Sequence, residues 1–252
     1  MNNGFCTDNF VLIKYISSGG FGHVFMVFDR LLNIYAAIKI SKSSNHIELQ
    51  REIDIIKELT LLDIPNTTKF YGSGYCSLFN NKSFKYKFDI KDEHPLYYEM
   101  SLQDEKLQTY IDNNNKLTSL QLFDMIFELL YTISYFRKYN FKHRDISTYN
   151  ILYKVNPQSR EYILLSNKRI IINNDIQPII ADYNTSIFEP YNTNNVNDFN
   201  DIIATLGVIQ QLLDVTLDID NDIGIIQNMI NDISENDNLS YEFLQSILNE
   251  YY

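Results

Sequence analysis

The sequence predicts an α+β protein in which a β-rich N-terminal half is followed by a mostly α-helical C-terminal half. Short stretches of β-branched and aromatic residues, separated by turns, fill the first half and are typical of strands. Longer stretches with apolar residues at helical spacing dominate from residue 101 onward. This change of pattern places a first unit at residues 1–100 and a second unit at residues 101–252.

The first half is expected to contain three strands, one helix and then further strands. The helix covers residues 44–62, with Ile47, Ile53 and Ile56 near one face, and either Ser44 or Asn45 can cap its N-terminus. The expected strands are FVLIKYI (10–16), HVFMVFD (23–29), IYAAIKI (34–40), TKFYGSGYC (68–76), SFKYKFDI (83–90) and PLYYEM (95–100).

The second half is expected to alternate helices with short strands. Residues 156–175 read as an extra hairpin. The expected helices are 107–114, the strongly periodic 119–140, 198–214, 222–233 and 239–252. The expected strands are NILYKV (150–155), EYILLSN (161–167), RIIIN (169–173) and PIIADY (178–183).

Composition narrows the class of protein. With 252 residues, of which 45% are hydrophobic, the chain can bury a sizeable core. The net charge is −11, and the 21 Lys and Arg residues are spread along the chain, so no nucleic-acid partner is expected. The acidic balance indicates a solvated surface and leaves room for a basic protein partner or substrate.

Cysteine usage and the terminus bear on the compartment. Cys6 and Cys76 are too few for a disulfide framework or a zinc site, and we expect free thiols in a reducing compartment. The N-terminus lacks the basic and apolar regions of a signal peptide, and no apolar run is long enough to span a bilayer. Together these features predict an intracellular, cytoplasmic protein.

A glycine-rich hairpin, ISSGGFGHV (16–24), lies between the first two expected strands. Glycine backbone can approach phosphate oxygens without a side-chain clash, so the hairpin is a candidate for binding phosphates. Lys39 follows in AAIK, inside an apolar strand, where an ammonium group needs an anionic partner. The next helix offers Glu48 and Glu52, which share one face because they are four residues apart. Either pair would orient Lys39 toward phosphates held by the hairpin.

The stretch HRDISTYN (143–150) combines a carboxylate and an amide at a fixed spacing. Asp145 can accept a hydroxyl proton, and Asn150 offers an amide oxygen to a hard cation such as Mg²⁺. Asp182, in IIADYN, ends an apolar strand at a loop, where a carboxylate can reach a metal ion.

Taken in order, these motifs resemble the eukaryotic-type protein kinase family over about residues 10–210. The family pattern is a Gly-rich loop, Val-Ala-Ile-Lys, a helix Glu, His-Arg-Asp-x-x-x-x-Asn and Asp-Phe-Gly. Here it reads SSGGFGHV, AAIK, REIDIIKEL, HRDISTYN and ADYN. The resemblance implies a bilobal fold with a β-rich N-lobe, which holds one main helix, and a reduced, mostly α C-lobe. It also implies ATP with Mg²⁺ or Mn²⁺ as cofactors, and a protein as substrate.

The resemblance implies a role for each matching residue. Asp145 would be the catalytic base, and Lys39, paired with Glu52, would hold the α- and β-phosphates. Asn150 and Asp182 would bind the metal ion. The implied catalytic residues are Asp145, Lys39 and Asn150. The implied nucleotide-binding residues are Ile16, Ser17, Ser18, Gly19, Gly20, Phe21, Gly22, Val24, Ala37, Lys39, Glu52, Glu99, Met100 and Leu152.

Further roles follow from position within the family pattern. Tyr98 would be the gatekeeper, and the backbone of Glu99 and Met100 would form the hinge that bonds adenine. Asp201, or else Asp198, would open the long central helix. The residues that would sandwich the adenine ring are Val24, Ala37 and Leu152.

The sequence departs from the family pattern in its motifs. Ser17 replaces the first glycine, and Ser147 replaces a Lys that contacts the γ-phosphate, which should slow transfer. Asn184 replaces the glycine of Asp-Phe-Gly, so we expect it to adopt left-handed backbone geometry, which Asn tolerates. The insert at 156–175 resembles those of divergent kinases of large DNA viruses, and the composition, which is rich in Ile, Asn and Tyr and typical of an AT-rich genome, agrees. In that case the host cytoplasm would be the compartment.

The segment after Asp182 is short. In the family, the residue equivalent to Arg144 often pairs with a phosphorylated side chain. Candidate sites are Thr185, Ser186 and Thr193, but so short a segment favours an enzyme that needs no such phosphorylation. The predicted function is phosphoryl transfer from ATP to Ser or Thr of a protein. The alternatives are a pseudokinase that acts as a binding scaffold and a small-molecule kinase of similar fold.

Overall fold

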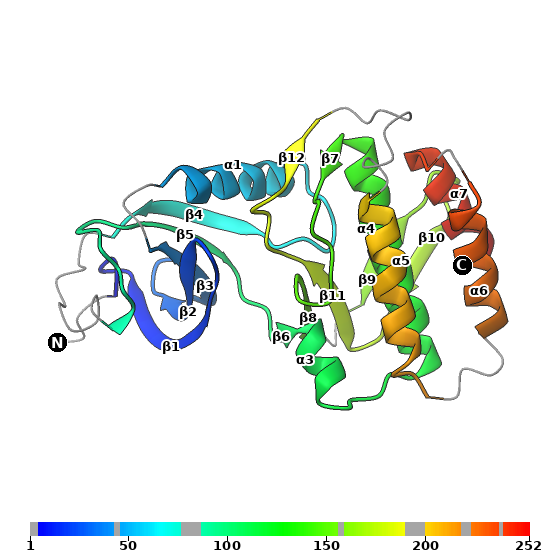
Figure 1. Ribbon diagram of the computed structural model, residues 1–252, viewed down its shortest axis with the longest axis horizontal. Helices are drawn as coiled ribbons and strands as arrows, with labels where there is room; N and C mark the ends of the chain where they lie inside the picture. Colours follow the sequence, from blue (N-terminus) through cyan, green and yellow to red (C-terminus); the bar gives the residue numbers. More distant parts are fainter. Residues whose placement is uncertain are drawn as a thin grey trace. The chain divides into compact units, whose positions relative to one another are not determined.

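The computed structural model describes residues 5–42, 46–76, 87–155, 159–189, 200–217, 223–236 and 239–252 (Figure 1). The chain divides into two compact units. The N-terminal unit comprises the residues up to 62 together with 68–103, and the C-terminal unit comprises 63–67 together with 104–252. In the described part of the chain, no helix is both long and apolar enough to cross a membrane.

The N-terminal unit is built on a five-stranded antiparallel sheet with the order β1-β2-β3-β5-β4. Strands expected from the sequence form where the apolar stretches predict them. Half of the expected strand at 83–90 lies outside the described residues, and its described part, 87–90, is not a strand. The bounds are β1 Phe10–Ser18, β2 Gly22–Asp29, β3 Ile34–Ser41, β4 Phe70–Tyr75 and β5 Leu96–Ser101.

The helix α1, Ile47–Leu61, carries the face that the sequence predicts only in part. Ile53 and Ile56 are buried, but Ile47 is 72% exposed, so its expected place on the apolar face is wrong. With 3.6 residues per turn, Ile47 lies about 120° from Ile53 and about 180° from Ile56 around the helix, so it faces away from them, whereas Leu49 in the same first turn is buried. The two expected capping residues lie outside the described residues, and the N-cap position is His46, whose side chain makes no capping bond.

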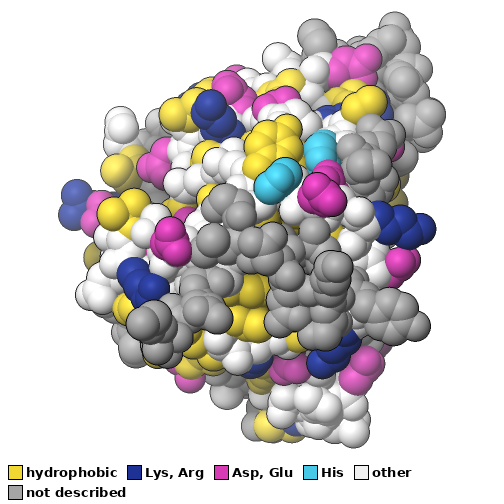
Figure 2. Space-filling model, turned by 90° about the vertical axis from the view of Figure 1, so that its left-hand side faces the viewer, with side chains coloured by type: hydrophobic (Ala, Val, Ile, Leu, Met, Phe, Trp, Pro, Cys, Tyr) yellow, Lys and Arg dark blue, Asp and Glu magenta, His cyan; other side chains and the backbone are white. Residues whose placement is uncertain are grey.

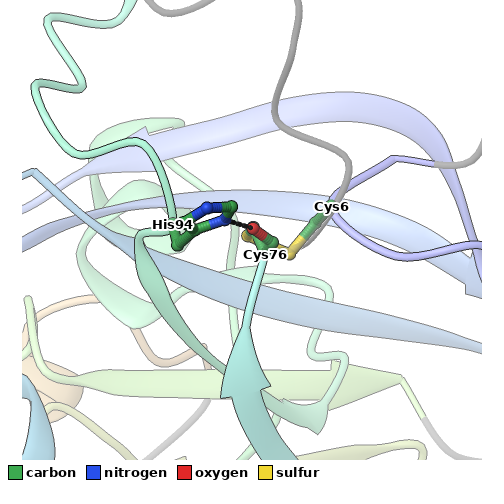
Figure 3. Close-up of a disulfide and its surroundings, with 3 residues drawn as sticks. All are labelled: Cys6, Cys76 and His94. Carbon is green, nitrogen blue, oxygen red and sulfur yellow. Dashed lines mark hydrogen bonds between the residues drawn. A yellow bond between two sulfur atoms is a disulfide. The ribbon is translucent and has the colours of Figure 1, made fainter.

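A disulfide joins Cys6 to Cys76 in the N-terminal unit (Figure 3). The two Cα atoms are 4.4 Å apart, and His94 Nδ1 lies 3.2 Å from the carbonyl oxygen of Cys76. The expectation of two free thiols is therefore wrong. The sequence could not reveal the pairing, because the residues are 70 positions apart and meet only through the sheet. The expected reducing compartment thereby loses one of its supporting observations.

The disulfide belongs to a core cluster on one face of the sheet. It packs with buried side chains of β2 and β3 and with Ile90 from the segment before β5. The buried members of this cluster are Cys6, Phe10, Phe25, Val27, Ala36, Ile38, Ile40, Cys76 and Ile90. Side chains alternate along a strand, so the intervening residues of β2 and β3 face the other side of the sheet.

The C-terminal unit centres on the long helix α4, Ser119–Lys138, which packs against α5, α7, β7 and β11 (Figure 1). Thr118 and Gln121 form a capping box that fixes its start. The other helices are α3 Leu107–Asp112, α5 Asn200–Leu213, α6 Ile223–Ser234 and α7 Tyr241–Tyr251. The helical pattern of the second half is thus confirmed.

Among the described residues of the C-terminal unit there are also three small antiparallel sheets, with the orders β11-β8-β6, β12-β7 and β10-β9. The last is the hairpin that the sequence predicts as an insert. The two shortest pairs, in which β6 and β12 take part, were not predicted because two residues carry no periodicity. The bounds are β6 Glu105–Lys106, β7 Phe141–Lys142, β8 Ile151–Val155, β9 Arg160–Ile163, β10 Arg169–Ile172, β11 Ile176–Ile180 and β12 Ile187–Phe188.

Charged side chains are dispersed on the face shown in Figure 2. Among the residues coloured there, dark-blue Lys and Arg side chains lie apart from one another and are interspersed with magenta Asp and Glu side chains. This arrangement is that of a solvated surface, and the coloured residues form no continuous basic field on this face.

Candidate functional site

In the N-terminal unit, Lys39 and Glu52 form a buried ion pair. Lys39 Nζ donates to both carboxylate oxygens of Glu52, at 2.8 Å and 2.6 Å. Glu48, the alternative partner from the sequence, is exposed on the same helix. The hydroxyl of Tyr98 on β5 donates to Glu52 Oε1 at 2.9 Å. Glu52 therefore binds both the ammonium group of Lys39 on β3 and the hydroxyl of Tyr98 on β5. The sequence predicted the ion pair but not the bond to Tyr98.

Strand register aligns the candidate nucleotide-binding residues in two rows. Val24 pairs with Lys39, which pairs with Tyr98, and paired residues of antiparallel strands share a face. Ala37 pairs with Met100 in the next row of the same face. The sheet therefore presents most of the expected residues of β2, β3 and β5 together, on the face that carries Lys39.

Glu99 lies on the opposite face, where it pairs with Ile38. Its side chain is buried, and burial together with the nearby carboxylate of Asp29 raises the pKa of Glu99 to about 7. The side chain of Glu99 therefore does not contact a ligand on the Lys39 face, and its backbone lies between Ile38 of β3 and Gly72 of β4, so its role in a hinge stays a prediction.

The glycine-rich hairpin closes tightly at its end. Gly19 N donates to the carbonyl oxygen of Gly22 at 2.9 Å, and Lys42 Nζ donates to the carbonyl of Gly19 at 2.6 Å. A Cβ on Gly22 would lie 2.7 Å from the carbonyl oxygen of Ile40, so only glycine fits there. The other expected residues of this loop, Ile16, Ser17, Ser18, Gly20 and Phe21, form the end of β1 and the turn.

In the C-terminal unit, Asp145 and Asn150 lie in direct contact. Asn150 Nδ2 donates to the Asp145 carboxylate at 2.8 Å and to the Asp145 carbonyl at 2.9 Å. The backbone N–H of Ala181 donates to the carbonyl of Asn150 at 2.9 Å. Because Asp182 follows Ala181 directly, the chain brings the three predicted catalytic and metal-binding residues of this unit, Asp145, Asn150 and Asp182, close together.

His143 is a neutral support beneath this loop. Its Nδ1 accepts from the backbone N–H of Asp145 at 3.3 Å, so its Nε2 carries the proton toward the carbonyl of Ala181, 3.0 Å away. Burial lowers the pKa of His143, although the carboxylate of Asp201 acts in the opposite direction. His143 therefore fixes the distance between the loop and the residue that precedes Asp182.

Asp201 holds the backbone of the same loop. Its two carboxylate oxygens accept from the N–H groups of His143 at 2.6 Å and of Arg144 at 2.7 Å. It is the second residue of α5, as expected from the sequence, whereas the alternative, Asp198, lies outside the described residues. These bonds support Arg144, whose φ of 70° is rare for a residue with a side chain.

The segment Asp182–Asn184 differs from expectation in its backbone. The left-handed residue is Asp182, with φ 65°, and not Asn184. Asn184 therefore does not have to adopt the geometry of a glycine, and its side-chain amide instead donates to the carboxylate of Asp182. Tyr183 is buried, and the centroid of its ring lies 5.4 Å from the centroid of the His143 ring. Left-handed geometry at non-glycine residues is costly and concentrates at functional sites.

Leu152 lies on β8 of the C-terminal unit, half-buried, two residues after Asn150. Ser147 lies inside the loop, where its carbonyl accepts from the N–H groups of Asn150 and Ile151, both at 3.0 Å. Position 147, where the family pattern has a Lys, thus forms a turn of the loop, and its backbone carbonyl holds the backbone of Asn150.

Sequence reasoning missed one group of charges beside the loop. Glu189 Oε2 lies 3.2 Å from the guanidinium of Arg144 and 3.4 Å from Nζ of Lys142. No signal was available from the sequence, because Lys142 lies in the polar stretch RKYNFKHRD, where neither the burial of its ammonium group nor its need of an anion can be predicted. Nothing local identified Glu189 as that anion, because the contact depends on the short pairing of β12 with β7.

Comparison with known proteins agrees with this arrangement. A probable serine/threonine-protein kinase of Dictyostelium discoideum is 26% identical over 148 residues, which cover 58% of this chain and 19% of the relative. The Aurora kinase of Saccharomyces cerevisiae is 27% identical over 152 residues, which cover 58% of this chain and 36% of the relative. The chain thus matches well under half of the length of either relative. Neither organism is a virus, so these relatives lend no support to the expected viral likeness.

A solved structure supports the fold. The crystal structure of a kinase domain matches with a TM-score of 0.60 and 18% identity, covering 84% of this chain and 66% of that chain. At this identity the match concerns the fold alone, and it confirms the kinase-like arrangement of strands and helices. The family model described as a protein kinase domain matches residues 10–166. The chain belongs to the protein kinase domain family.

Proposed function

We propose that this protein is an ATP-dependent protein kinase that transfers the γ-phosphoryl group to a Ser or Thr hydroxyl of a protein substrate. The observation that carries the proposal is the cluster of Asp145, Asn150 and Asp182, held through Ala181, His143 and Asp201. A loop fixed at so many points presents its carboxylate in a defined place, as a base for proton transfer requires.

The side chains on the Lys39 face of the N-terminal unit are suited to bind a nucleoside triphosphate. Lys39 is an ammonium group kept in place by Glu52, and Gly22 keeps the hairpin backbone close to β3. Lys39 would bind phosphate oxygens, and the apolar side chains around it on the same face of the sheet would accept a purine ring. Val24, Ala37 and Met100 are the members of that surface that register aligns.

Proton transfer is assigned to Asp145. As the substrate hydroxyl oxygen bonds to the γ-phosphorus, the bond from phosphorus to the bridging oxygen breaks, and ADP leaves with the electron pair. Asp145 accepts the proton that the hydroxyl loses. Asn150 orients the Asp145 carboxylate through its amide, so loss of either side chain removes the same function.

Asn150 and Asp182 are the residues that would hold Mg²⁺ or Mn²⁺, which when bound neutralises phosphate charge. Both offer oxygen donors, and Asp182 is exposed on its loop. Across the described residues, no three His, Cys, Asp or Glu side chains are grouped to hold a metal ion unaided. Two protein ligands, completed by phosphate and water oxygens, are what Mg²⁺ sites of this chemistry use.

Ser147 favours a second candidate, a pseudokinase that binds a partner without transfer. The loop has no Lys at this position, so one positive charge expected near the γ-phosphate is absent from it. The cluster around Asp145 nevertheless retains each group that the transfer needs, and it supports the enzyme over the scaffold.

Radiolabel transfer from ATP to a generic basic protein tests the proposal. The expected result is transfer by the wild type and background label with Asp145→Asn or Lys39→Met. Asp112→Asn and Lys116→Met make the same chemical changes at exposed positions of α3 and the loop after it, and they should leave transfer unchanged. Equal background from wild type and both site variants would favour the scaffold.

A further inference from the structure

The segment after Asp182 turns back and pairs with the strand that leads into the catalytic loop. Ile187 and Phe188 of β12 pair with Lys142 and Phe141 of β7. The N–H of the next residue, Glu189, donates to the carbonyl of Asn140 at 2.8 Å. Glu189 is thus fixed by its backbone beside the residues that precede His143.

The side chain of Glu189 bridges two cations. Its Oε2 lies 3.4 Å from Lys142 Nζ and 3.2 Å from Arg144 Nη2. The Lys142 side chain is 7% exposed, and a buried ammonium group requires anions around it. The Arg144 side chain is 46% exposed, so this pair adds little stability and acts mainly on geometry.

Arg144 connects this charge cluster to the chemistry. Its backbone has a left-handed φ of 70°, and its N–H is bound by Asp201. Asp145 is the next residue in the chain. A side chain that anchors the guanidinium of Arg144 therefore acts on the backbone conformation that presents the Asp145 carboxylate.

We propose that Glu189 is a positioning residue of the catalytic loop, which supplies in the unmodified chain the negative charge that activation-segment phosphorylation would otherwise provide. The inference rests on the proposed function. Phosphate groups order such segments through new pairs with Arg side chains, and here a carboxylate already occupies that place.

Two of the three candidate phosphorylation sites named from the sequence are engaged as hydrogen-bond donors. Thr185 Oγ1 donates to the carbonyl of His143 at 3.0 Å, and Ser186 Oγ donates to the same carbonyl at 3.1 Å. Ser186 is fully buried. A phosphate ester has no hydroxyl proton, and it would set negative oxygens against a carbonyl oxygen. Phosphorylation at either residue would thus disrupt the loop. Thr193 lies outside the described residues.

The test compares Glu189→Gln, Glu189→Asp and Glu161→Gln with the wild type. Glu161 forms an exposed ion pair with Arg169 at 2.9 Å on the β9–β10 hairpin, so its variant is a matched control. Each protein is treated with phosphatase, and mass spectrometry verifies that no phosphate remains. We expect the treated wild type to keep its full rate of transfer.

Glu189→Gln should lower kcat about tenfold, with the KM for ATP changed less than about twofold, because the charge acts on the loop and not on nucleotide binding. Glu189→Asp should recover part of the rate, and Glu161→Gln all of it. Loss of wild-type activity on phosphatase treatment would overturn the inference, as would full activity of Glu189→Gln.

Hydrogen exchange of the peptides that cover 141–150 and 183–189 provides a readout independent of transfer. Exchange in both should be faster in Glu189→Gln than in wild type and unchanged in Glu161→Gln. An inactive wild type would defeat the proposed function alone, and this measurement would still decide the inference. Unchanged exchange in Glu189→Gln would refute the positioning role.

Discussion

At the scale of single residues, Tyr98 makes an important contact although it lies outside the five motifs that identify the family. Its hydroxyl donates to Glu52, which in turn holds Lys39. Tyr98→Phe removes one bond to a buried carboxylate, so the free energy of unfolding should fall by about 1–2 kcal/mol. Nucleotide affinity should fall several-fold, because Lys39 is less firmly oriented. Urea unfolding and calorimetric titration with a non-hydrolysable ATP analogue measure the two effects.

Tyr97→Phe is the matched control, since it makes the same chemical change one residue earlier, on the opposite face of β5. It should leave nucleotide affinity unchanged. Equal losses of affinity in both variants, or none in Tyr98→Phe, would show that the hydroxyl of Tyr98 does not act through Glu52.

Single residues also show how far the sequence could be interpreted. That Lys39 pairs with an acidic residue of the next helix was predictable, because a charge in an apolar strand needs a partner, but the choice of Glu52 over Glu48 came from the family resemblance. Asp145 with Asn150 was predictable because their short spacing places them in one loop. Asp201 was expected only through the family resemblance, since its carboxylate meets residues 57 and 58 positions away. The left-handed geometry of Asp182 was assigned to Asn184, because residue type suggests which side chains tolerate it but not where the chain demands it.

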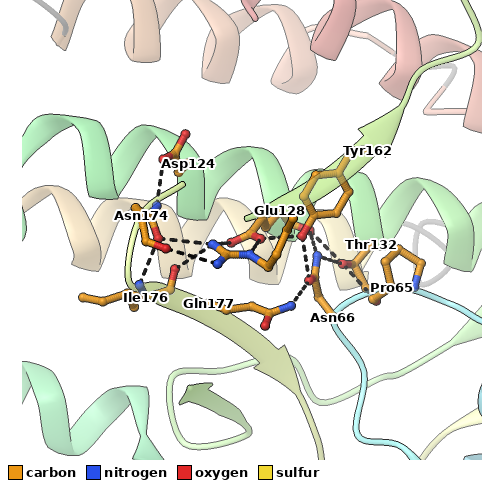
Figure 4. Close-up of polar contacts among 10 residues, drawn as sticks. Pro65, Asn66, Asp124, Glu128, Thr132, Tyr162, Asn174, Ile176 and Gln177 are labelled. Atoms are coloured by element: carbon orange, nitrogen blue, oxygen red, sulfur yellow. Dashed lines mark hydrogen bonds and ion pairs between the residues drawn. The ribbon is translucent and has the colours of Figure 1, made fainter. Parts of the chain in front are cut away.

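At the scale of elements, the inserted hairpin β9–β10 is fastened to α4 by a buried polar network (Figure 4). Arg160 of β9 donates to Glu128 of α4 at 2.5 Å, and the single hydroxyl of Tyr162 lies within hydrogen-bond reach of both Glu128 Oε1 and, at 3.0 Å, Asn66 Oδ1. Gln177 of β11 also donates to Asn66, at 2.8 Å. The hairpin therefore joins α4 to the strand that precedes Asp182.

The hairpin was predictable from its two apolar stretches, but its role was not. Glu128 was the one local signal, a carboxylate within the apolar run MIFELLYTI of α4. Burial raises the pKa of Glu128 to about 7, while Arg160 acts in the opposite direction and favours the charged form. Which cation approaches it depends on how the insert folds back, and periodicity says nothing of that.

Replacement of Arg160 tests the importance of this element. Arg160→Met leaves the fully buried Glu128 without its ion-pair partner, so the free energy of unfolding should fall by about 3–5 kcal/mol. The double variant with Glu128→Leu should recover much of that loss, because both charges are then gone. Arg169→Met, which breaks an exposed ion pair of the same hairpin, should cost under about 1 kcal/mol. Urea unfolding of the wild type and these three variants measures the changes. Equal losses of unfolding free energy in Arg160→Met and Arg169→Met would contradict a stabilising role of the buried network.

At the scale of the whole molecule, the division into two units departs from the order of the sequence. Residues 63–67 follow α1 but belong to the C-terminal unit. The reason lies in Asn66. Its side-chain Nδ2 donates to the backbone carbonyl of Glu128 and to the hydroxyl of Thr132, both at 3.1 Å, and its backbone carbonyl accepts from the backbone N–H of Ile180. A boundary drawn from composition alone could not detect this segment, because its membership is decided by hydrogen bonds to residues more than 60 positions away.

The disulfide acts on only one of the two units, which yields a prediction for the whole molecule. Cys6 and Cys76 close a loop of 70 positions within the N-terminal unit, and such a cross-link stabilises by about 2–4 kcal/mol, chiefly by restricting the unfolded chain. The double variant Cys6→Ser with Cys76→Ser should therefore unfold at a lower temperature than the unreduced wild type. Hydrogen exchange should rise in β1 and β4 and stay unchanged in α4 and α5 of the C-terminal unit. A reductant should lower the midpoint of the wild type and have no effect on the double variant. Thiol titration of the denatured, unreduced wild type should find no free thiol, and two titratable thiols there would restore the original expectation of unpaired cysteines.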